Sequence, residues 1–259
     1  MPQRELEGRS AIITGAGAGL GKGIALAFAA EGANVVLTAR RAQPLQAVAA
    51  EIKSAGHADA MVVTADVSKE ADVDALFDQV VGRYGKVDIV VNNAGIAGEV
   101  GNIWELSLAG WQETIDTNLT GPWLCTRAAA KVMLPRREGK IINIGSISGK
   151  RPLATRTPYT SSKMGLVGLT RTAAVELGEH NINVNLISPG AVQTERLALL
   201  AQSWKRPLQD LIDEFSELAA FKRLAQVDDI ANLAVFLASE RSRNITGVDI
   251  TCSAGQWFD

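Results

Sequence analysis

The chain has 259 residues, of which 47% are hydrophobic, which is enough for a large buried core and, in an α/β protein, often for a single domain. Its formal net charge of −2 gives no basic surplus for binding nucleic acid or an anionic membrane surface. No apolar signal segment opens the chain, and no run reaches the roughly 18 apolar residues that a membrane span needs. We therefore expect a cytoplasmic protein with free thiols at Cys125 and Cys252, and no metal site, because His57 and His180 lack ligand spacing.

Short apolar runs alternate with longer amphipathic stretches along the chain. Continuous apolar runs are typical of a parallel sheet that is covered on both faces. The repeated strand–helix unit predicts an α/β fold, a doubly wound parallel sheet of about seven strands with helices on both faces, over residues 1–259 as a single domain. The predicted strands span 11–14, 34–38, 60–64, 87–91, 140–144, 183–188 and 248–251. The predicted helices span about 20–31, 42–55, 69–84, 108–135, 158–179 and 226–238.

A glycine-rich turn directly follows the first predicted strand. Its residues fit T-G-x-x-x-G-x-G, with Thr14, Gly15, Gly19, Leu20 and Gly21 as the predicted cofactor contacts. Such a turn lets the backbone approach a phosphate and aims free N–H groups at it. Neither the P-loop pattern nor the common G-x-G-x-x-G spacing fits these positions. The turn indicates a pyrophosphate site, although glycines also cluster where a chain simply turns without binding a ligand.

The end of the second predicted strand bears on the choice of cofactor. Folds that bind NAD usually carry an acidic residue there for the adenosine ribose, but this chain has Ala39 followed by Arg40 and Arg41. Guanidinium groups suit a 2′-phosphate, and the missing carboxylate removes repulsion against it. We therefore predict NADP(H), with NAD(H) as the alternative if the two arginines are only solvated charges at a helix start.

Small and polar residues follow three later predicted strands. The carboxyl ends of parallel strands meet at one edge of the sheet, where ligands bind in open α/β folds. Asp66 is placed where its carboxylate could accept a hydrogen bond from an adenine amino group, although each segment alone fits a simple strand-end turn. The predicted cofactor contacts from these segments are Asp66, Val67, Asn93, Ala94, Gly95, Pro189, Gly190, Val192 and Thr194.

Tyr159 and Lys163 are four residues apart, so on a helix they share one face. A free tyrosine has a pKa of about 10, but a neighbouring ammonium favours the phenolate and lowers that pKa, as acid–base catalysis at neutral pH requires. Ser146 follows the fifth predicted strand, where its hydroxyl can orient a substrate oxygen. These three residues predict hydride exchange between an alcohol and a nicotinamide cofactor, although Y-x-x-x-K alone is common on helix surfaces. A serine hydrolase is disfavoured because Ile147 stands where that motif needs its serine.

In order and spacing, these residues resemble the short-chain dehydrogenase/reductase family, in its 3-oxoacyl-carrier-protein-reductase-like branch, over essentially the whole chain. The resemblance implies a Rossmann fold and an alcohol dehydrogenase or carbonyl reductase, for which Arg40 and Arg41 predict a preference for NADP(H). It implies that Tyr159 is the acid–base catalyst, Ser146 polarises the carbonyl, and Lys163 binds the nicotinamide ribose and lowers the pKa of the tyrosine. It also implies that Asn118 holds a water in a proton relay with Lys163, a position that would otherwise suit a helix-kink asparagine.

The resemblance further implies a small-molecule alcohol or carbonyl substrate and assembly as a homotetramer or homodimer, with no nucleic-acid or membrane partner. A catalytically silent nucleotide-binding or sensing protein on the same fold is the alternative. That alternative predicts a damaged catalytic set, whereas all four residues are present. One departure is Ser253-Ala254-Gly255, where family members often carry Asp-Gly-Gly.

The segment 192–222 interrupts the strand–helix repeat and follows the last long predicted strand. Its position predicts a substrate lid, with an ordinary surface helical hairpin as the alternative. Basic residues in or near the expected pocket favour an anionic substrate, although solvated surface charge explains them equally well, and Trp104 and Trp204 would suit a cyclic or steroidal ketone. The basic residues are Arg151, Arg156, Arg196, Lys205 and Arg206.

Overall fold

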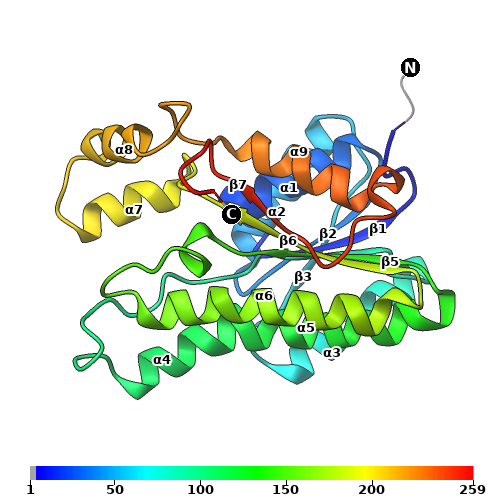
Figure 1. The fold of residues 1–259 in the computed structure, drawn as a ribbon. Helices are drawn as coiled ribbons and strands as arrows, with labels where there is room; N and C mark the ends of the chain where they lie inside the picture. The colour runs from blue at the N-terminus through cyan, green and yellow to red at the C-terminus, as the bar shows by residue number, and fades with distance from the viewer. Residues whose placement is uncertain (1–3, 259) are drawn as a thin grey trace.

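Seven parallel strands form one sheet at the centre of the computed structural model, which describes residues 4–258 (Figure 1). Residues 1–3 and 259 of the predicted domain lie outside the described residues. The strand order is β3-β2-β1-β4-β5-β6-β7, so the chain reverses its direction of travel across the sheet between β1 and β4. Ligands bind at such switch points in doubly wound folds. The strands are β1 Ser10–Thr14, β2 Asn34–Ala39, β3 Met61–Thr64, β4 Ile89–Asn92, β5 Gly139–Ile144, β6 Ile182–Pro189 and β7 Asp249–Cys252.

Helices cover both faces of this sheet, which confirms the predicted fold class (Figure 1). Side chains alternate along each strand: Ile13 packs in the core under one helix layer, and its neighbour Ile12 packs in the core under the other. The first layer contains α1 Gly19–Ala30, α2 Ala42–Ser54 and α9 Val227–Ala238. The second contains α3 Glu70–Tyr84, α5 Gly121–Met133 and α6 Thr157–Gly178, with α4 Leu108–Ile115 beside α6.

The prediction of a single helix over 108–135 is wrong in one respect, because a π-helical segment at Asp116–Thr120 separates α4 from α5. The N–H of Gly121 donates to the carbonyl of Asp116, five residues back instead of four. Pro122 has no N–H to donate to the carbonyl of Asn118, so the regular α-helical ladder cannot continue there. One-turn π segments are frequent at functional sites, and this one contains Asn118.

The segment 192–222 folds as two helices, α7 Glu195–Ser203 and α8 Leu208–Glu217, which extend beyond the sheet (Figure 1). Trp204–Pro207 joins them, and Lys205 takes a positive φ of 52°. The two helices share a small apolar cluster of their own, formed by Leu197, Ala201, Leu211 and Leu224.

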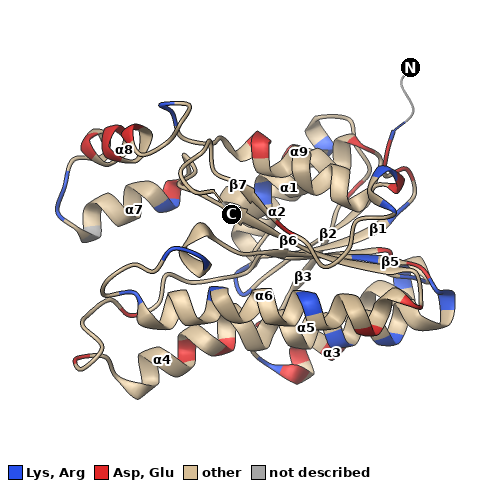
Figure 2. Cartoon of the chain, in the orientation of Figure 1, with Lys and Arg blue, Asp and Glu red and all other residues tan. Residues whose placement is uncertain are grey.

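Charged residues of both signs are spread over the helices and loops (Figure 2). Figure 2 shows both signs of charge on each side of the sheet. No helix within residues 4–258 is long and apolar enough to cross a membrane. In the same part of the chain, no group of three or more His, Cys, Asp or Glu side chains is placed to hold a metal ion.

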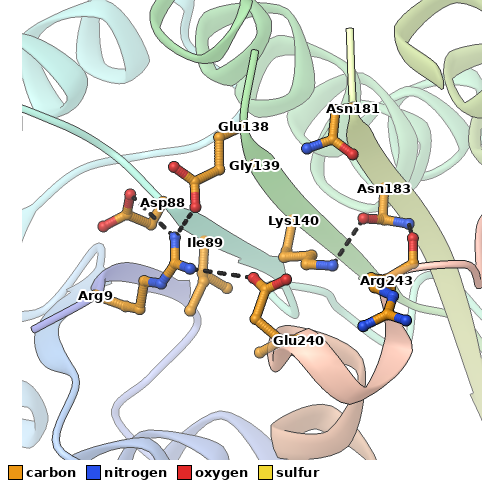
Figure 3. Close-up of a pocket in the computed structure, with 11 residues that line it drawn as sticks. Arg9, Asp88, Ile89, Glu138, Gly139, Lys140, Asn181, Asn183, Glu240 and Arg243 are labelled. Atoms are coloured by element: carbon orange, nitrogen blue, oxygen red, sulfur yellow. Dashed lines mark hydrogen bonds and ion pairs between the residues drawn. The ribbon is translucent and has the colours of Figure 1, made fainter. Parts of the chain in front are cut away.

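A polar network closes the amino edge of the sheet, opposite the strand ends that carry the predicted site. It surrounds a hollow of about 130 Å³ and links Arg9 to Glu138 and Glu240, and Lys140 to Asn183 (Figure 3). Beside the hollow, the Asp88 side chain is only 1% exposed. Lys86 and Arg136 each approach its carboxylate to 2.7 Å, and the Ser10 N–H donates to it at 2.9 Å. These charges already have partners within the protein, so we interpret the network as structural.

Asp88→Asn is expected to lower the free energy of unfolding at pH 7 by about 2–4 kcal/mol, because a buried carboxylate loses its ion pairs. Burial opposes ionisation of Asp88, but Lys86, the Ser10 N–H and Arg136 outweigh it and hold the pKa of Asp88 below its ordinary value. The stabilisation is therefore complete above about pH 4, the ordinary Asp value, and is lost as the pH falls through the lowered pKa. Urea unfolding of both proteins across this range measures the difference.

The matched control for this substitution is Asp59→Asn, which removes an exposed ion pair with Lys53. We expect it to change the free energy of unfolding by less than about 0.5 kcal/mol. Equal stabilities of wild type and Asp88→Asn at pH 7 would contradict the structural role of the network.

Candidate active site

Thr14, at the end of β1, joins the glycine-rich turn to the end of β4. Its Oγ1 accepts hydrogen bonds from the N–H groups of Asn93 and Ala94, both at 2.9 Å, and donates to the carbonyl of Val91 at 3.2 Å. The Asn93 amide donates in return to the carbonyls of Thr14 at 2.9 Å and Gly15 at 3.2 Å. The two loops at the switch point are therefore fixed to each other by one hydroxyl and one carboxamide.

Close approach of neighbouring atoms requires glycine at two positions of the turn. Gly15 has a φ of 66°, and a Cβ there would lie 2.9 Å from the Cα of Ala94. A Cβ on Gly21 would collide with the carbonyl oxygen of Gly15. At Gly19 the space is open: a Cβ would meet nothing nearer than Thr194, at 3.9 Å. The turn is thus packed on its inner side and open between Gly19 and Thr194.

The amino end of α1 faces this opening without a side-chain cap. The side chain of its N-cap residue, Ala18, cannot accept a hydrogen bond, so the first N–H groups of the helix are left for an external acceptor. The side chain of Leu20 packs against the core, which leaves its backbone as the part available for contact. An uncapped helix terminus beside a glycine turn is suited to a phosphate group.

The ends of β2 and β3 form the outer part of the same edge. Arg40 and Arg41 are exposed after β2. Burial raises the pKa of Asp66, but hydrogen bonds from Ser68, at 2.7 and 3.1 Å, and the charge of Arg40 outweigh burial and lower it overall. The Asp66 carboxylate is therefore held ionised and oriented. Its neighbour Val67 is buried against α5, where a Cβ on Gly121 would lie 2.8 Å from its side chain.

Lys163 is buried on α6, and its Nζ donates to the carbonyl of Ile144 at 2.8 Å. Burial lowers the pKa of this ammonium, and the nearby phenol of Tyr159 partly opposes that effect. Gly95 lies across from it: a Cβ there would stand 3.8 Å from Nζ and 3.2 Å from Oδ1 of Asn118. The missing side chain at Gly95 therefore gives a ligand access to the lysine.

The carboxamide of Asn118 is held from two directions. Its Oδ1 accepts from the Ile96 N–H at 2.8 Å, and its Nδ2 donates to the Ile96 carbonyl at 3.0 Å and to Ser162 at 3.2 Å. Ser162 donates in turn to the carbonyl of Tyr159 at 2.7 Å. Ser162 belongs to none of the sequence motifs; its place three residues after the tyrosine, on the inner face of α6, is the signal that could have identified it.

Tyr159 lies at the start of α6, with Ser146 and Lys163 beside it. Ser146 Oγ accepts from the N–H of Ser148 at 3.0 Å, which leaves its own proton for another acceptor. Lys163 Nζ is 5.7 Å from the centroid of the tyrosine ring. Burial raises the pKa of Tyr159, but Lys163 above all, then Arg196, a hydrogen bond with Ser146, and Arg156 lower it, and the net shift is downward. This environment favours proton exchange by the phenol nearer neutral pH.

The structure adds two arginines to the surroundings of Tyr159. The Cζ of Arg156 is 5.0 Å from the centroid of the tyrosine ring, and that of Arg196 is 5.3 Å from it. Arg156 immediately precedes α6, whereas Arg196 belongs to α7. From the sequence, both residues are only basic members of nearby loops, because nothing in the chain order predicts that they meet at one ring.

The predicted residues after β6 divide between the site and the protein interior. Thr194 faces the open side of the glycine turn, and Val192 is buried in a bridge to Ala225. Gly190 instead adjoins the C-terminal tail, where a Cβ would lie 2.8 Å from the Cβ of Ser253. Pro189 ends β6. The small residue at 190 is therefore required by the tail, whatever else it contacts.

Known proteins match this chain over nearly its whole length. A family model described as enoyl-(acyl carrier protein) reductase matches residues 15–256. The 3-oxoacyl-[acyl-carrier-protein] reductase FabG of Staphylococcus epidermidis is 36% identical, covering 96% of this chain and 99% of that protein. The (2S)-[(R)-hydroxy(phenyl)methyl]succinyl-CoA dehydrogenase subunit BbsD of Thauera aromatica is 37% identical, with coverage of 93% and 94%.

Solved structures agree with these sequence matches. Levodione reductase superimposes with a TM-score of 0.93 at 32% identity, covering 97% of this chain and 98% of that one. A putative gluconate dehydrogenase from Agrobacterium tumefaciens gives 0.91 at 34% identity, with coverage of 99% and 98%. The names of these relatives refer to chemically different compounds, so the shared fold does not select a substrate.

Proposed function

Since the chain belongs to the short-chain dehydrogenase/reductase family of oxidoreductases, in the branch of the 3-oxoacyl-[acyl-carrier-protein] reductases, we propose that it transfers a hydride between NADP(H) and a secondary alcohol or ketone. The observation that carries this proposal is the lowered pKa of Tyr159, with Lys163 and Ser146 beside it. A protein that binds a nucleotide without catalysing a reaction has no need of a phenol whose pKa is lowered.

The carboxyl edge of the sheet fits a dinucleotide. The uncapped N–H groups of α1 and the opening between Gly19 and Thr194 suit the pyrophosphate, and the gap over Gly95 gives a ribose access to Lys163. When bound, the nicotinamide supplies or accepts the hydride. The residues that would hold the cofactor are Thr14, Gly15, Gly19, Leu20, Gly21, Arg40, Arg41, Asp66, Val67, Asn93, Ala94, Gly95, Tyr159, Lys163, Pro189, Gly190, Val192 and Thr194.

In the reducing direction, Ser146 and Tyr159 donate hydrogen bonds to the substrate carbonyl oxygen and so favour the negative charge that develops on it. Tyr159 then gives up its proton to that oxygen, and the positive charge of Lys163 stabilises the resulting phenolate. In the oxidising direction, the phenolate removes the hydroxyl proton. Ser146 is ready to donate because its own oxygen already accepts from the Ser148 N–H.

The phenol must recover its proton after each reduction. We assign Asn118 to this step, with its main-chain carbonyl as the acceptor for a relay water near Lys163. Pro122 has no N–H to offer that carbonyl, and the carboxamide of Asn118 is already bonded to Ile96 and Ser162. The π-helical segment would then serve to present a backbone oxygen.

The experiment that tests this proposal follows reduced-nicotinamide absorbance with a panel of ketones and alcohols, using NADPH and NADH in parallel. We expect turnover that is faster with NADPH. Tight nucleotide binding without turnover of any compound would favour the silent nucleotide-binding protein instead.

Arg40→Asp is expected to reverse the cofactor preference. A carboxylate at the end of β2 repels a 2′-phosphate and can accept hydrogen bonds from free ribose hydroxyls, so the ratio of kcat/KM for NADPH to that for NADH should fall by about 10²-fold. Steady-state kinetics with both cofactors measure this ratio. An unchanged ratio would mean that Arg40 is only a solvated charge.

Two structural expectations are also part of the proposal. We propose that residues 1–259 form one domain in which 192–222 acts as a lid over the substrate. We also propose a homodimer or homotetramer, supported by large apolar side chains on the outer faces of α5 and α6. Trp123 is 46% exposed, Met164 52% and Val175 82%.

A further inference from the structure

Three cations surround the ring of Tyr159, two more than proton transfer at the phenol requires. Besides Lys163, the guanidinium groups of Arg156 and Arg196 lie 5.0 and 5.3 Å from the ring centroid. The side-chain charges that act most strongly on Tyr159 are all positive. The positive charge beside the predicted substrate position is therefore not neutralised locally.

The two arginines repel each other and have no carboxylate partner among the described residues. Burial lowers the pKa of Arg156, Tyr159 opposes this effect, and the charge of Arg196 lowers the pKa further. Arg156 donates to the Ala97 carbonyl at 3.1 Å, but its Nε is buried and has no hydrogen-bond partner. In the same segment as Arg196, Arg206 is neutralised by Glu214 at 2.7 Å. A buried donor in a pair of unneutralised guanidiniums indicates a place for an anion.

The origin of the two side chains is consistent with substrate recognition. Arg156 comes from the loop before α6, which follows Ser146, and Arg196 comes from the first turn of α7 in the segment 192–222. An anion held between them would touch both the fixed part of the site and the segment proposed as a lid. It would also lie close to the reacting oxygen, because both guanidiniums contact the ring that carries the phenol.

We propose that Arg156 and Arg196 together bind a carboxylate of the substrate, which is therefore a short oxo acid or the corresponding hydroxy acid. This inference rests on the hydride transfer proposed above. The closeness of both guanidiniums to one phenol ring favours a carboxylate close to the carbonyl carbon, as in 2-oxo and 3-oxo acids. An oxoacyl thioester presents no negative charge at that position.

The test compares a 3-oxo acid and a 2-oxo acid with their ethyl esters, which keep the carbon skeleton and remove the charge. We expect wild type to prefer the acids in kcat/KM. In Arg156→Gln and Arg196→Gln, kcat/KM for the acids should fall by about 10- to 100-fold, mainly through KM, while the values for the esters change little. Arg196→Lys should recover part of the loss, and Arg83→Gln, which changes an exposed arginine in the last turn of α3, is the control that should behave as wild type.

The comparison separates substrate binding from mere tuning of the phenol. If the arginines only lower the pKa of Tyr159, each substitution lowers the rates for acid and ester alike, and the inference is wrong. Equal kcat/KM of wild type for acids and esters would also overturn it.

Binding measurements keep the inference testable even if no carbonyl compound is reduced. Isothermal titration calorimetry of the acids into the complex of the protein with NADP should then detect binding, and Arg156→Gln and Arg196→Gln should each weaken it. Turnover or binding of the acids that depends on both arginines supports the anion site. Absence of turnover alone counts against the proposed hydride transfer, and absence of binding counts against the anion site.

Discussion

Replacing Tyr159 with phenylalanine is expected to lower kcat/KM for carbonyl reduction by about 10³-fold, the usual loss when a positioned general acid is removed. The substitution deletes one oxygen and leaves the ring, so its contacts with Arg156 and Arg196 remain. The binding of nucleotide, measured by fluorescence titration, should change little, because the glycine turn, the end of β4 and Lys163 are all retained.

The chain offers a natural control for this substitution, because its only other tyrosine is Tyr84, at the end of α3. Tyr84→Phe should retain the wild-type kcat/KM. Retention of full activity by Tyr159→Phe would remove the proposed acid–base catalyst.

Lys163→Met is expected to lower kcat/KM by about 10²-fold or more and to change the pH profile of alcohol oxidation. Oxidation needs the phenolate, so its rate rises with pH through the pKa of Tyr159. Burial raises that pKa, and Lys163 is the largest of the influences that lower it. Removing the ammonium therefore raises the pKa of the tyrosine and moves the rising limb to higher pH.

The measurement is kcat/KM for oxidation of one alcohol across the pH range, with the binding of nucleotide determined separately. Lys163→Arg is the matched variant, because it retains a positive charge and should keep part of the wild-type profile. A Lys163→Met enzyme whose rising limb stays at the wild-type pH would show that the lysine does not act on the phenol.

Much of the fold could be predicted from the sequence because each signal is local. Continuous apolar runs identified all seven strands to within two residues, and their alternation with helical stretches predicted the doubly wound sheet. The π-helical segment was missed even though Pro122 signals it, because the apolar periodicity continues through the interruption. The exact ends of helices depend on caps and tertiary contacts, which periodicity does not describe.

The candidate site could likewise be predicted only where its signals are local in the sequence. Tyr159 and Lys163 could be found because they are one helical turn apart, and the glycine turn because its spacing is fixed by backbone geometry. The hydrogen bonds of Thr14 to the end of β4 depend on strand pairing, which the sequence does not specify. The meeting of Arg156 and Arg196 on one ring brings together the loop before α6 and the first turn of α7, which α6 and β6 separate in the chain, so only the structure shows it.

The most direct test of hydride transfer uses NADPH that carries deuterium at C4 of the nicotinamide, on the face from which it is donated. The substrate is the best ketone from the panel, and the alcohol product is analysed by mass spectrometry and NMR. The account predicts one deuterium on the carbinol carbon of the product, and none when Tyr159→Phe replaces wild type over the same time. A product without deuterium, or tight NADPH binding with no product from any ketone, would contradict it.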